Sequence, residues 1–308
     1  MKPPHGAVPG AAPFHDPGQD HPCHDDDPGQ DDDSGQDGGS GQDGAMMSSS
    51  TEKNDGWMET VKTVFWALVI AGIFRTLFFQ PFWIPSGSMK ETLLIGDFLF
   101  VNKMAYGYSR YSCPFAMCPF TGRIFATEPE RGDVVVFRHP VTGADFIKRV
   151  IGTPGDRVQM RAGTLYLNDE PLPQEPAGQF AEVYERQGSV GQFPRCANAP
   201  VGQGGTCLKD RYMEALPGGR AYPVLNIEDG GFGDNTPAFT VPDGHFFFIG
   251  DNRDNSIDSR VPQNAGGVGM VPFDHLIGRA NRVMFSSAGR SMLAFWTWRS
   301  DRFFHQLQ

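Results

Sequence analysis

The chain is 308 residues long, enough for one large domain or two ordinary domains with a substantial core. Its formal net charge at pH 7 is −10, but residues 1–50 contain ten Asp and a single Lys, a net charge of −9. The rest of the chain is therefore nearly neutral, which excludes a strongly acidic or strongly basic folded domain.

Residues 1–56 are predicted to form a disordered acidic tail rich in Gly, Asp and Gln. The tripeptide Gly-Gln-Asp recurs four times in this tail, and Phe14 is almost its only large apolar residue. Such a segment cannot bury enough apolar surface to offset the entropy cost of ordering. Residues 21–24, His-Pro-Cys-His, have ligands for a soft metal, but structural sites normally take four ligands from an ordered scaffold, so no metal site is predicted.

A single transmembrane helix is predicted over residues 57–80. The apolar run at 61–79 has about the length needed to cross a bilayer, ~20 residues, and Pro81 ends it. Lys62 can reach one interface, and Arg75 must reach the other interface or a protein partner. The alternatives are a buried helix of a soluble protein and a cleavable signal peptide. The signal peptide fits less well, because a long polar stretch precedes the run.

Downstream of Pro81, short runs of Val, Ile and Phe are separated by Gly, Pro and Asp, a pattern typical of β-strands joined by turns. We therefore expect a mostly β fold, with a core formed by residues 81–160 and 245–285 and an inserted β-rich subdomain at 161–244. Residues 286–308 form a C-terminal segment with two Trp near Arg, which suits a membrane interface, although core packing explains it equally well. The candidate strands are 97–102, 133–138, 145–150, 163–167 and 245–249.

Four cysteines lie beyond the tail, in two close pairs: Cys113 with Cys118, and Cys196 with Cys207. An even number at short spacing is compatible with two local disulfides in an oxidising compartment. Four buried free thiols remain the alternative.

A candidate nucleophile is Ser88, within Pro85-Ser86-Gly87-Ser88-Met89. Proline and glycine favour a turn here, which would hold Ser88 at the apex of a loop. The amide of Ser88 and the hydroxyl of Ser86 could then face a developing oxyanion. The segment is not the Gly-x-Ser-x-Gly elbow of α/β hydrolases, and an ordinary serine-rich loop is the alternative.

A candidate base is Lys148, within the expected strand at 145–150. Alternation along a strand places Lys148 on the same face as Phe146 and Val150. Lysine can activate a serine hydroxyl only when it is neutral, yet an ordinary pKa of ~10.4 leaves only about one amine in 2,500 uncharged at pH 7. Burial among apolar neighbours would lower this pKa. The alternative is a lysine at a strand end that faces solvent.

A third cluster, residues 250–260, follows the expected strand at 245–249 and reads Gly-Asp-Asn-Arg-Asp-Asn-Ser-Ile-Asp-Ser-Arg. Its central Ser256 could orient the amine of Lys148, while Asp–Arg pairs hold the loop rigid. A solvated turn is the alternative reading.

Taken together, these segments resemble the bacterial type I signal peptidases, which are membrane-anchored Ser-Lys proteases that remove signal peptides from exported proteins. The likeness runs from about residue 57 to residue 284 and includes the serine segment, residues 131–137, residues 146–156 and residues 251–260. It implies a largely antiparallel β catalytic domain with an inserted subdomain, and no metal or cofactor. The chain departs from the family at Glu91, where proline is usual.

The resemblance implies Ser88 as nucleophile, Lys148 as general base, Ser86 as an oxyanion donor and Ser256 as the residue that orients the lysine. Shallow apolar pockets would admit only small side chains, as in Ala-x-Ala cleavage sites. The supporting charges would be Asp251, Asp258, Arg260 and Arg149, and the pocket residues would be Ile84, Met89, Leu93, Phe146 and Ile147.

The resemblance further implies that signal peptides of secretory pre-proteins and the lipid bilayer are partners, with the export translocon as a further candidate and no nucleic acid. The expected location is the bacterial inner membrane, in a single pass, with the tail cytoplasmic and the catalytic domain periplasmic. One alternative is a self-cleaving protease of the SOS repressor type, although nothing here resembles its DNA-binding module. Another is a membrane-anchored β-rich binding or assembly factor that has lost catalysis, to which Glu91 is the one hint.

Overall fold

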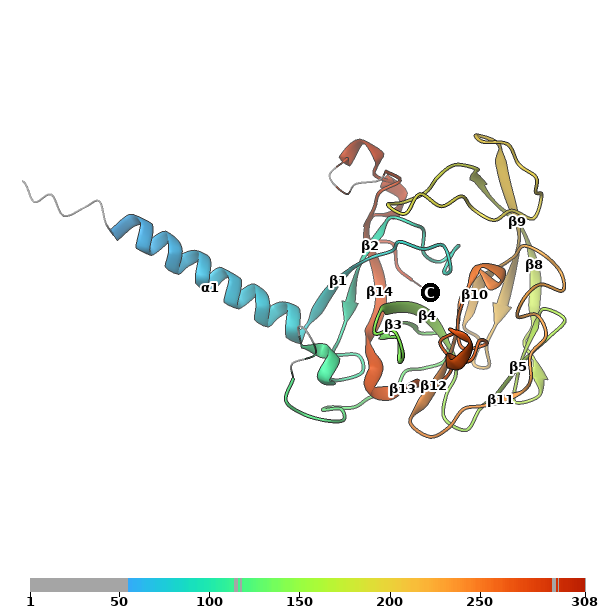
Figure 1. Cartoon of the computed structure of the whole chain (residues 1–308), viewed down its shortest axis with the longest axis horizontal. Coiled ribbons are helices and arrows are strands. Elements are labelled where there is room, and N and C mark those ends of the chain that lie inside the picture. Colours follow the sequence, from blue (N-terminus) through green and yellow to red (C-terminus); the bar gives the residue numbers. More distant parts are fainter. Residues whose placement is uncertain (1–54, 114–115, 117, 290–291, 293, 308) are drawn as a thin grey trace, which may run out of the picture. The chain divides into compact units, whose positions relative to one another are not determined.

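The computed structural model describes residues 55–113, 116, 118–289, 292 and 294–307. Within these residues the chain forms one α-helix followed by fourteen β-strands and several short 3-10 turns (Figure 1). The acidic tail and its His-Pro-Cys-His segment lie outside the described residues as far as residue 54. Residues 55–56, which we predicted to belong to the tail, already form the start of the helix.

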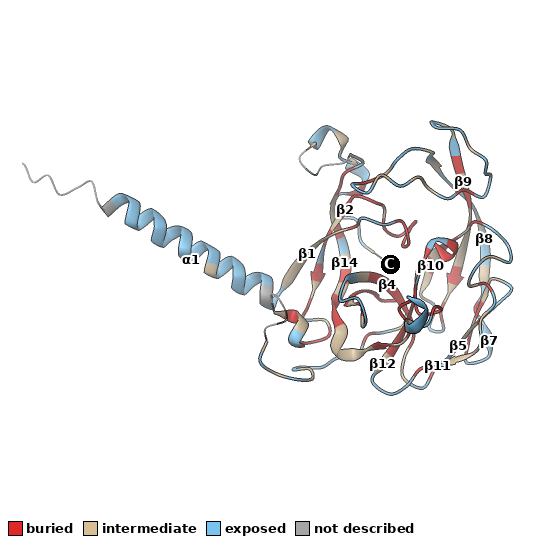
Figure 2. Cartoon of the chain, viewed as in Figure 1, coloured by how far each residue is buried: buried red, intermediate tan, exposed pale blue. Residues whose placement is uncertain are grey.

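The helix α1, Asp55–Leu77, is long and apolar enough over Gly56–Arg75 to cross a membrane. Its large apolar side chains are exposed, including Leu68 and Ile70, and Figure 2 shows exposed residues along most of the helix. Helices that are apolar on all sides are found in protein cores or in membranes, and this one is not covered by the protein. The predicted span at 57–80 is wrong at its end, because the helix stops at Leu77.

The strand β1, Phe79–Trp83, explains the early end of the helix. It pairs antiparallel with β2, Asp97–Asn102, so that Phe79 lies opposite Asn102 and Trp83 opposite Phe98. Pro81 lies in the middle of β1. Proline cannot donate to a β-ladder but is tolerated in an edge strand, and β1 is the first strand of its sheet.

The central sheet has seven strands in the order β1-β2-β14-β3-β4-β12-β13, and each neighbouring pair is antiparallel. The mostly β, antiparallel fold expected from the sequence is therefore confirmed. The predicted strands at 97–102 and 245–249 match β2 and β12, and the others differ by one or two residues. The remaining strands of the sheet are β3 Val134–Arg138, β4 Asp145–Gly152, β12 His245–Ile249, β13 Val271–Pro272 and β14 Leu276–Ser286.

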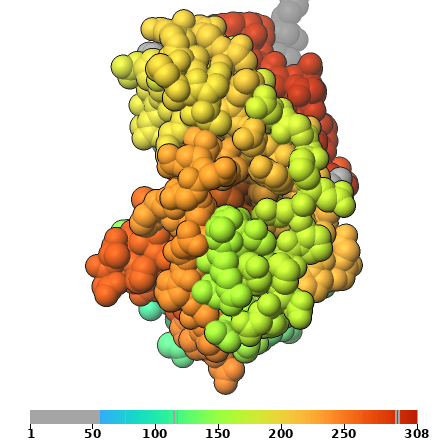
Figure 3. All heavy atoms as spheres, turned by 90° about the vertical axis from the view of Figure 1, so that its right-hand side faces the viewer, coloured from blue at the N-terminus to red at the C-terminus, as the bar shows by residue number. Residues whose placement is uncertain are grey.

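The strands β5 to β11 lie between β4 and β12 in the chain and form two smaller sheets. The strands β6 to β11 fall within the insertion expected at 161–244, whereas β5 begins at Arg157, in the segment that was assigned to the core. The orders of the two sheets are β11-β5-β6-β7 and β10-β9-β8. Figure 3 shows this face of the molecule, with lime, gold and orange segments around a hollow. The bounds are β5 Arg157–Arg161, β6 Thr164–Leu167, β7 Glu170–Pro171, β8 Gln174–Val183, β9 Thr206–Ala215, β10 Ala221–Asn226 and β11 Phe239–Thr240.

The inserted strands share a hydrophobic core with the central sheet. Ile151 of β4 and Phe247 of β12 are buried in the same cluster as Val158, Leu167 and Val224. Because one apolar cluster joins the two regions, burial of the central sheet depends on the inserted strands.

Both cysteine pairs are joined, Cys113 to Cys118 and Cys196 to Cys207. The C-terminal segment beyond β14 is held against the start of β2 by Arg302, whose Nη2 lies 2.5 Å from Asp97 Oδ2. Phe295 and Trp296 in the same segment are exposed. The segment thus combines a buried anchor with exposed aromatic side chains.

Candidate active site

Ser88 lies in the loop between β1 and β2, and only 7% of it is exposed. Asn252, in the loop after β12, holds this loop by two hydrogen bonds. Its backbone N–H donates to the carbonyl of Ser88 (3.0 Å), and its side-chain Nδ2 donates to the carbonyl of Gly87 (2.9 Å). Asn252 could not be identified from the sequence, because a polar loop does not reveal which of its side chains bonds to a distant backbone carbonyl.

Lys148 lies on β4, between β3 and β12, with Val135 of β3 as its direct neighbour across the ladder. Its Nζ donates to the Oγ of Ser88 at 2.5 Å and lies 5.6 Å from the centre of the Phe146 ring. Only 4% of the residue is exposed. The two residues proposed as base and nucleophile are therefore in direct contact.

Burial lowers the pKa of the Lys148 amine to about 8, although the carboxylates of Asp258 and Asp251 oppose this change and Arg260 adds to it. With this pKa, about one amine in ten is neutral at pH 7, against about one in 2,500 for an ordinary lysine. A neutral amine at hydrogen-bond distance from a serine hydroxyl is able to accept its proton.

Ser256 donates its hydroxyl proton to Asp258 Oδ2 (2.8 Å), which also accepts from the N–H of Gly250 (3.0 Å). Arg260 pairs with the same carboxylate, with Nε 2.8 Å from Oδ1. Burial alone would raise the pKa of Asp258, but Arg260 and the other donors hold it below its usual value. The Ser256 oxygen keeps its lone pairs as hydrogen-bond acceptors.

Gly250 allows these groups to approach the nucleophile. A Cβ at this position would lie 2.2 Å from Ser256 Oγ and 2.6 Å from the carbonyl oxygen of Ser88. The Ser256 hydroxyl and the Ser88 carbonyl therefore both lie against the α-carbon of Gly250, so a side chain at position 250 would push them away.

Arg149 and Asp251 form a buried bidentate pair. Arg149 Nε lies 2.9 Å from Asp251 Oδ1, and its Nη2 lies 2.8 Å from Oδ2. Thr92 donates to the same Oδ2 at 2.5 Å. This network joins β4, the loop after β12 and the segment that follows Ser88, so the four sequence-predicted charges Arg149, Asp251, Asp258 and Arg260 all lie around the Ser88–Lys148 contact.

A cleft of about 420 Å³ opens at this contact, and Ser86 is exposed along it. Of the predicted pocket residues, Ile84, Phe146 and Ile147 line the cleft. Met89 and Leu93 instead lie in the hydrophobic core cluster that contains Ile84 and Ile147. The lining residues are Phe82, Trp83, Ile84, Pro85, Ser86, Ser88, Val136, Asp145, Phe146, Ile147, Lys148, Asn255, Ile257 and Gly266.

Eight of the cleft residues were not predicted as site residues: Phe82, Trp83, Pro85, Val136, Asp145, Asn255, Ile257 and Gly266. They come from several strands and loops, and their convergence depends on strand pairing. Asp145 is paired with Arg138 at 3.0 Å, and burial raises the pKa of its carboxyl. Within the part of the chain that the structure describes, no group of three or more His, Cys, Asp or Glu side chains is arranged to hold a metal ion.

Comparisons with known proteins identify the family to which the chain belongs. The family model described as "Signal peptidase, peptidase S26" matches residues 57–285. Signal peptidase I of Rickettsia typhi is 37% identical over 251 residues, which cover 79% of this chain and 85% of that one. Signal peptidase I of Rickettsia akari is 38% identical over 255 residues, with coverage of 79% and 85%.

A crystal structure of a signal peptidase I from Enterococcus faecalis V583 is 25% identical with a TM-score of 0.26, and the match covers 50% of this chain and 97% of that one. The family match and the Rickettsia relatives span most of the chain, including the segments around Ser88 and Lys148. The chain is therefore a hydrolase that belongs to the signal peptidase family, peptidase S26.

Proposed function

We propose that the chain is a membrane-bound serine endopeptidase that removes N-terminal signal peptides from exported pre-proteins. The observation that carries this proposal is the 2.5 Å contact between Lys148 Nζ and Ser88 Oγ, made by an amine whose pKa burial lowers to about 8. Membership of the signal peptidase family supplies the class of substrate.

In the proposed mechanism, neutral Lys148 takes the proton of the Ser88 hydroxyl as its oxygen attacks the scissile carbonyl carbon. The amide of Ser88 and the hydroxyl of Ser86 donate hydrogen bonds to the oxyanion. The Lys148 ammonium then protonates the leaving amine, and the C–N bond breaks to leave an acyl ester on Ser88. Lys148, neutral again, takes a proton from a water molecule that hydrolyses this ester.

Ser256 would orient the amine of Lys148. Its proton is donated to Asp258, so its oxygen can accept a hydrogen bond from the lysine. Arg260 keeps the Asp258 carboxylate ionised, and the Arg149–Asp251 pair joins β4 to the loop after β12. These residues position the catalytic groups and do not react themselves.

The cleft supports a preference for small side chains, as in Ala-x-Ala cleavage sites. Ile84, Phe146 and Ile147 provide apolar walls beside Ser88. We propose that Met89 and Leu93, which are buried in the adjoining core cluster, support these walls without contacting substrate.

The distance along the chain supports action at a membrane surface. Ser88 lies nine positions after Phe79, which begins the strand after α1, so the extended chain between them spans at most about 30 Å. We propose a single pass through a bacterial inner membrane, with residues 1–54 in the cytoplasm and the catalytic domain in the periplasm. The bilayer and the export translocon would then be partners, because a signal peptide emerges at the same level.

The test is cleavage of a purified secretory precursor by the full-length chain in phospholipid vesicles. Ser88→Ala and Lys148→Met should each lower kcat by at least about a thousandfold, because nucleophile and base act as a unit. Ser300→Ala, at an exposed serine outside the cleft, is the matched control and should cleave normally. Wild-type cleavage by Ser88→Ala would refute the proposal and favour a β-rich binding factor.

A further inference from the structure

Lys90 and Glu91, two and three positions after the nucleophile Ser88, carry opposite charges, and neither has a part in the proposed chemistry. Only 3% of Lys90 is exposed, and its stem folds back over the nucleophile loop. A Cβ on Gly87 would lie 3.3 Å from Lys90 Cε, which is contact distance. A charged amine buried this deeply requires partners, because an unpaired buried charge is strongly unfavourable.

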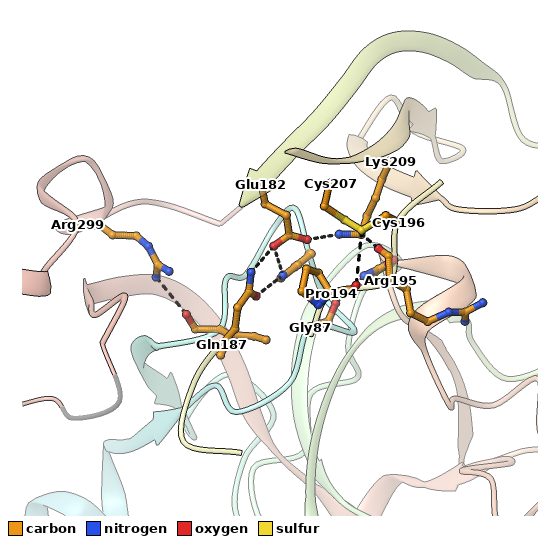
Figure 4. Close-up of polar contacts among 12 residues, drawn as sticks. Gly87, Glu182, Gln187, Pro194, Arg195, Cys196, Cys207, Lys209 and Arg299 are labelled. Carbon is orange, nitrogen blue, oxygen red and sulfur yellow. Dashed lines mark hydrogen bonds and ion pairs between the residues drawn. A yellow bond between two sulfur atoms is a disulfide. The ribbon is translucent and has the colours of Figure 1, made fainter. Parts of the chain in front are cut away.

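The partners of Lys90 come from the inserted β8–β9 hairpin and the loop that joins its strands. Its Nζ lies 2.5 Å from Glu182 Oε2 on β8 and 2.7 Å from Gln187 Oε1 in the loop. Lys209 on β9 donates to the other oxygen of Glu182, and Gln187 Nε2 donates to Oε2 at 2.7 Å. Figure 4 shows Glu182 between Lys209 and Gln187, with Gly87 of the nucleophile loop close by.

The disulfide secures this cluster. Cys207 lies directly opposite Glu182 in the β8–β9 register, and its bond to Cys196 ties the connecting loop back to β9. The N–H of Ala197 adds a bond to the carbonyl of Leu208 (2.7 Å). The loop that carries Gln187 is therefore fixed to the same hairpin as Glu182.

Glu91 forms a second ion pair with the hairpin. Here the negative charge lies on the segment after Ser88 and the positive charge lies on β9. Arg211 Nη1 lies 3.1 Å from Glu91 Oε1, and the side chains are 35% and 25% exposed respectively. Arg211 Nε and Nη2 also donate to the carbonyl of Ala177, at 2.8 and 2.6 Å. Ala177 lies where the β8–β9 register shifts between Pro176 and Gln179, so a bulge leaves its carbonyl available.

We propose that six residues position the nucleophile by joining its loop to the β8–β9 hairpin, so that the insertion sets the placement of Ser88 against Lys148. We call them the hairpin brace: Lys90, Glu91, Glu182, Gln187, Lys209 and Arg211. Only Met89 lies between Ser88 and Lys90, and the ion pairs Lys90–Glu182 and Glu91–Arg211 fix this segment in one place. A displacement of about 1 Å would break the Ser88–Lys148 contact, and errors of that size cost up to about a hundredfold in rate.

This inference rests on the proposed function and deepens it, since the brace residues act only through Ser88. It also gives Glu91 a role: where the family usually has a rigid proline, this chain has an ion pair that restrains the same segment. If the brace merely stabilised the fold, its loss would lower the melting temperature without selectively lowering kcat.

The experiment is a charge swap in the full-length protein, measured as kcat, KM and melting temperature with a precursor peptide. Glu91→Arg and Arg211→Glu should each lower kcat by about tenfold with KM within about twofold, because the reacting groups are displaced while the cleft remains. The double variant should recover to within about threefold of wild type, since the ion pair is restored with reversed polarity.

Matched controls come from Arg157 and Asp169, an exposed ion pair of 3.0 Å within the same insertion but without contact with the nucleophile loop. Arg157→Glu, Asp169→Arg and their double variant should keep kcat within about twofold, as exposed pairs contribute little.

Lys90→Met tests the buried pair of Lys90 with Glu182, and it should lower kcat with little change in KM.

The inference is overturned if the Glu91 and Arg211 single variants keep wild-type kcat, or if the swap fails to restore it. Ser88→Ala, assayed beside them, separates this result from the proposed function. If Ser88→Ala is inactive and the Glu91 and Arg211 variants keep wild-type kcat, only the positioning role of the hairpin brace is refuted. If Ser88→Ala is active, the Ser-Lys mechanism itself is refuted.

Discussion

Lys148 owes its chemistry to its surroundings, since the fold removes its amine from water and places it against the Ser88 hydroxyl. The carboxylates of Asp251 and Asp258 oppose the fall in pKa, but each is engaged by a buried arginine. Their negative charge is therefore partly balanced before it reaches the amine. Burial remains the largest influence, so the lysine is both close to the serine and substantially easier to deprotonate.

Gly250→Ala tests whether activity requires the close approach of the Ser256 hydroxyl and the Ser88 carbonyl to the Gly250 α-carbon. The added methyl group would clash with Ser256 Oγ and with the Ser88 carbonyl, so kcat/KM should fall by at least about tenfold and stability by about 1–3 kcal/mol. Gly202→Ala is the control, because open space surrounds that position. Enzyme kinetics and thermal unfolding of both variants would check this, and a fully active Gly250→Ala would show that the close approach is not needed.

Individual residues differ in how far the sequence could predict them. Ser88 and Lys148 are 60 positions apart, so motif resemblance brings them together where local periodicity cannot. The roles of Asn252 and Lys90 could not be predicted, because each depends on a partner segment that only the folded chain supplies. Met89 and Leu93 were expected in the pockets but pack in the core, since loop sequences do not show which way side chains point.

Among the elements, β1 shows why a helix boundary was misjudged. The apolar run at 61–79 extends past the end of α1 at Leu77 into Phe79, the first residue of β1, and hydropathy cannot show where a membrane helix gives way to an apolar strand. Pairing with β2 decides the outcome. The Gly- and Pro-rich segment between β4 and β12 led us to expect an insertion, but the core that this segment shares with β4 and β12 could not be predicted, because that core depends on packing between sheets.

The helix α1 carries a prediction about orientation. A single span places its flanks on opposite sides of the membrane, so protease added to intact spheroplasts should leave residues 1–50 uncut. The same protease should remove them after the membrane is opened with detergent, which serves as the control. Cleavage of this tail in intact spheroplasts would place the catalytic domain in the cytoplasm and contradict the proposed location.

At the scale of the whole molecule, the site is assembled from segments far apart in the chain. The loop after β1, strand β4 and the loop after β12 meet around Ser88. The β8–β9 hairpin contacts the segment after Ser88 through the pair of Lys90 with Glu182. Five of the fourteen strands in the described residues could be predicted from their composition and the turns between them. The sheet order could not, since β14 inserts between β2 and β3 through contacts made late in the sequence.

Titration of the Lys148 amine in the full-length protein tests the central claim most directly. Lysine side chains labelled with ¹³C at Cε would be followed by NMR from pH 6 to 12, with the Lys148 signal identified by its loss in Lys148→Met. We expect a pKa of about 8 for the Lys148 amine, and hence cleavage that falls with decreasing pH below this value as the amine becomes protonated. A Lys148 signal that titrates like an exposed lysine, near ~10.4, would contradict it.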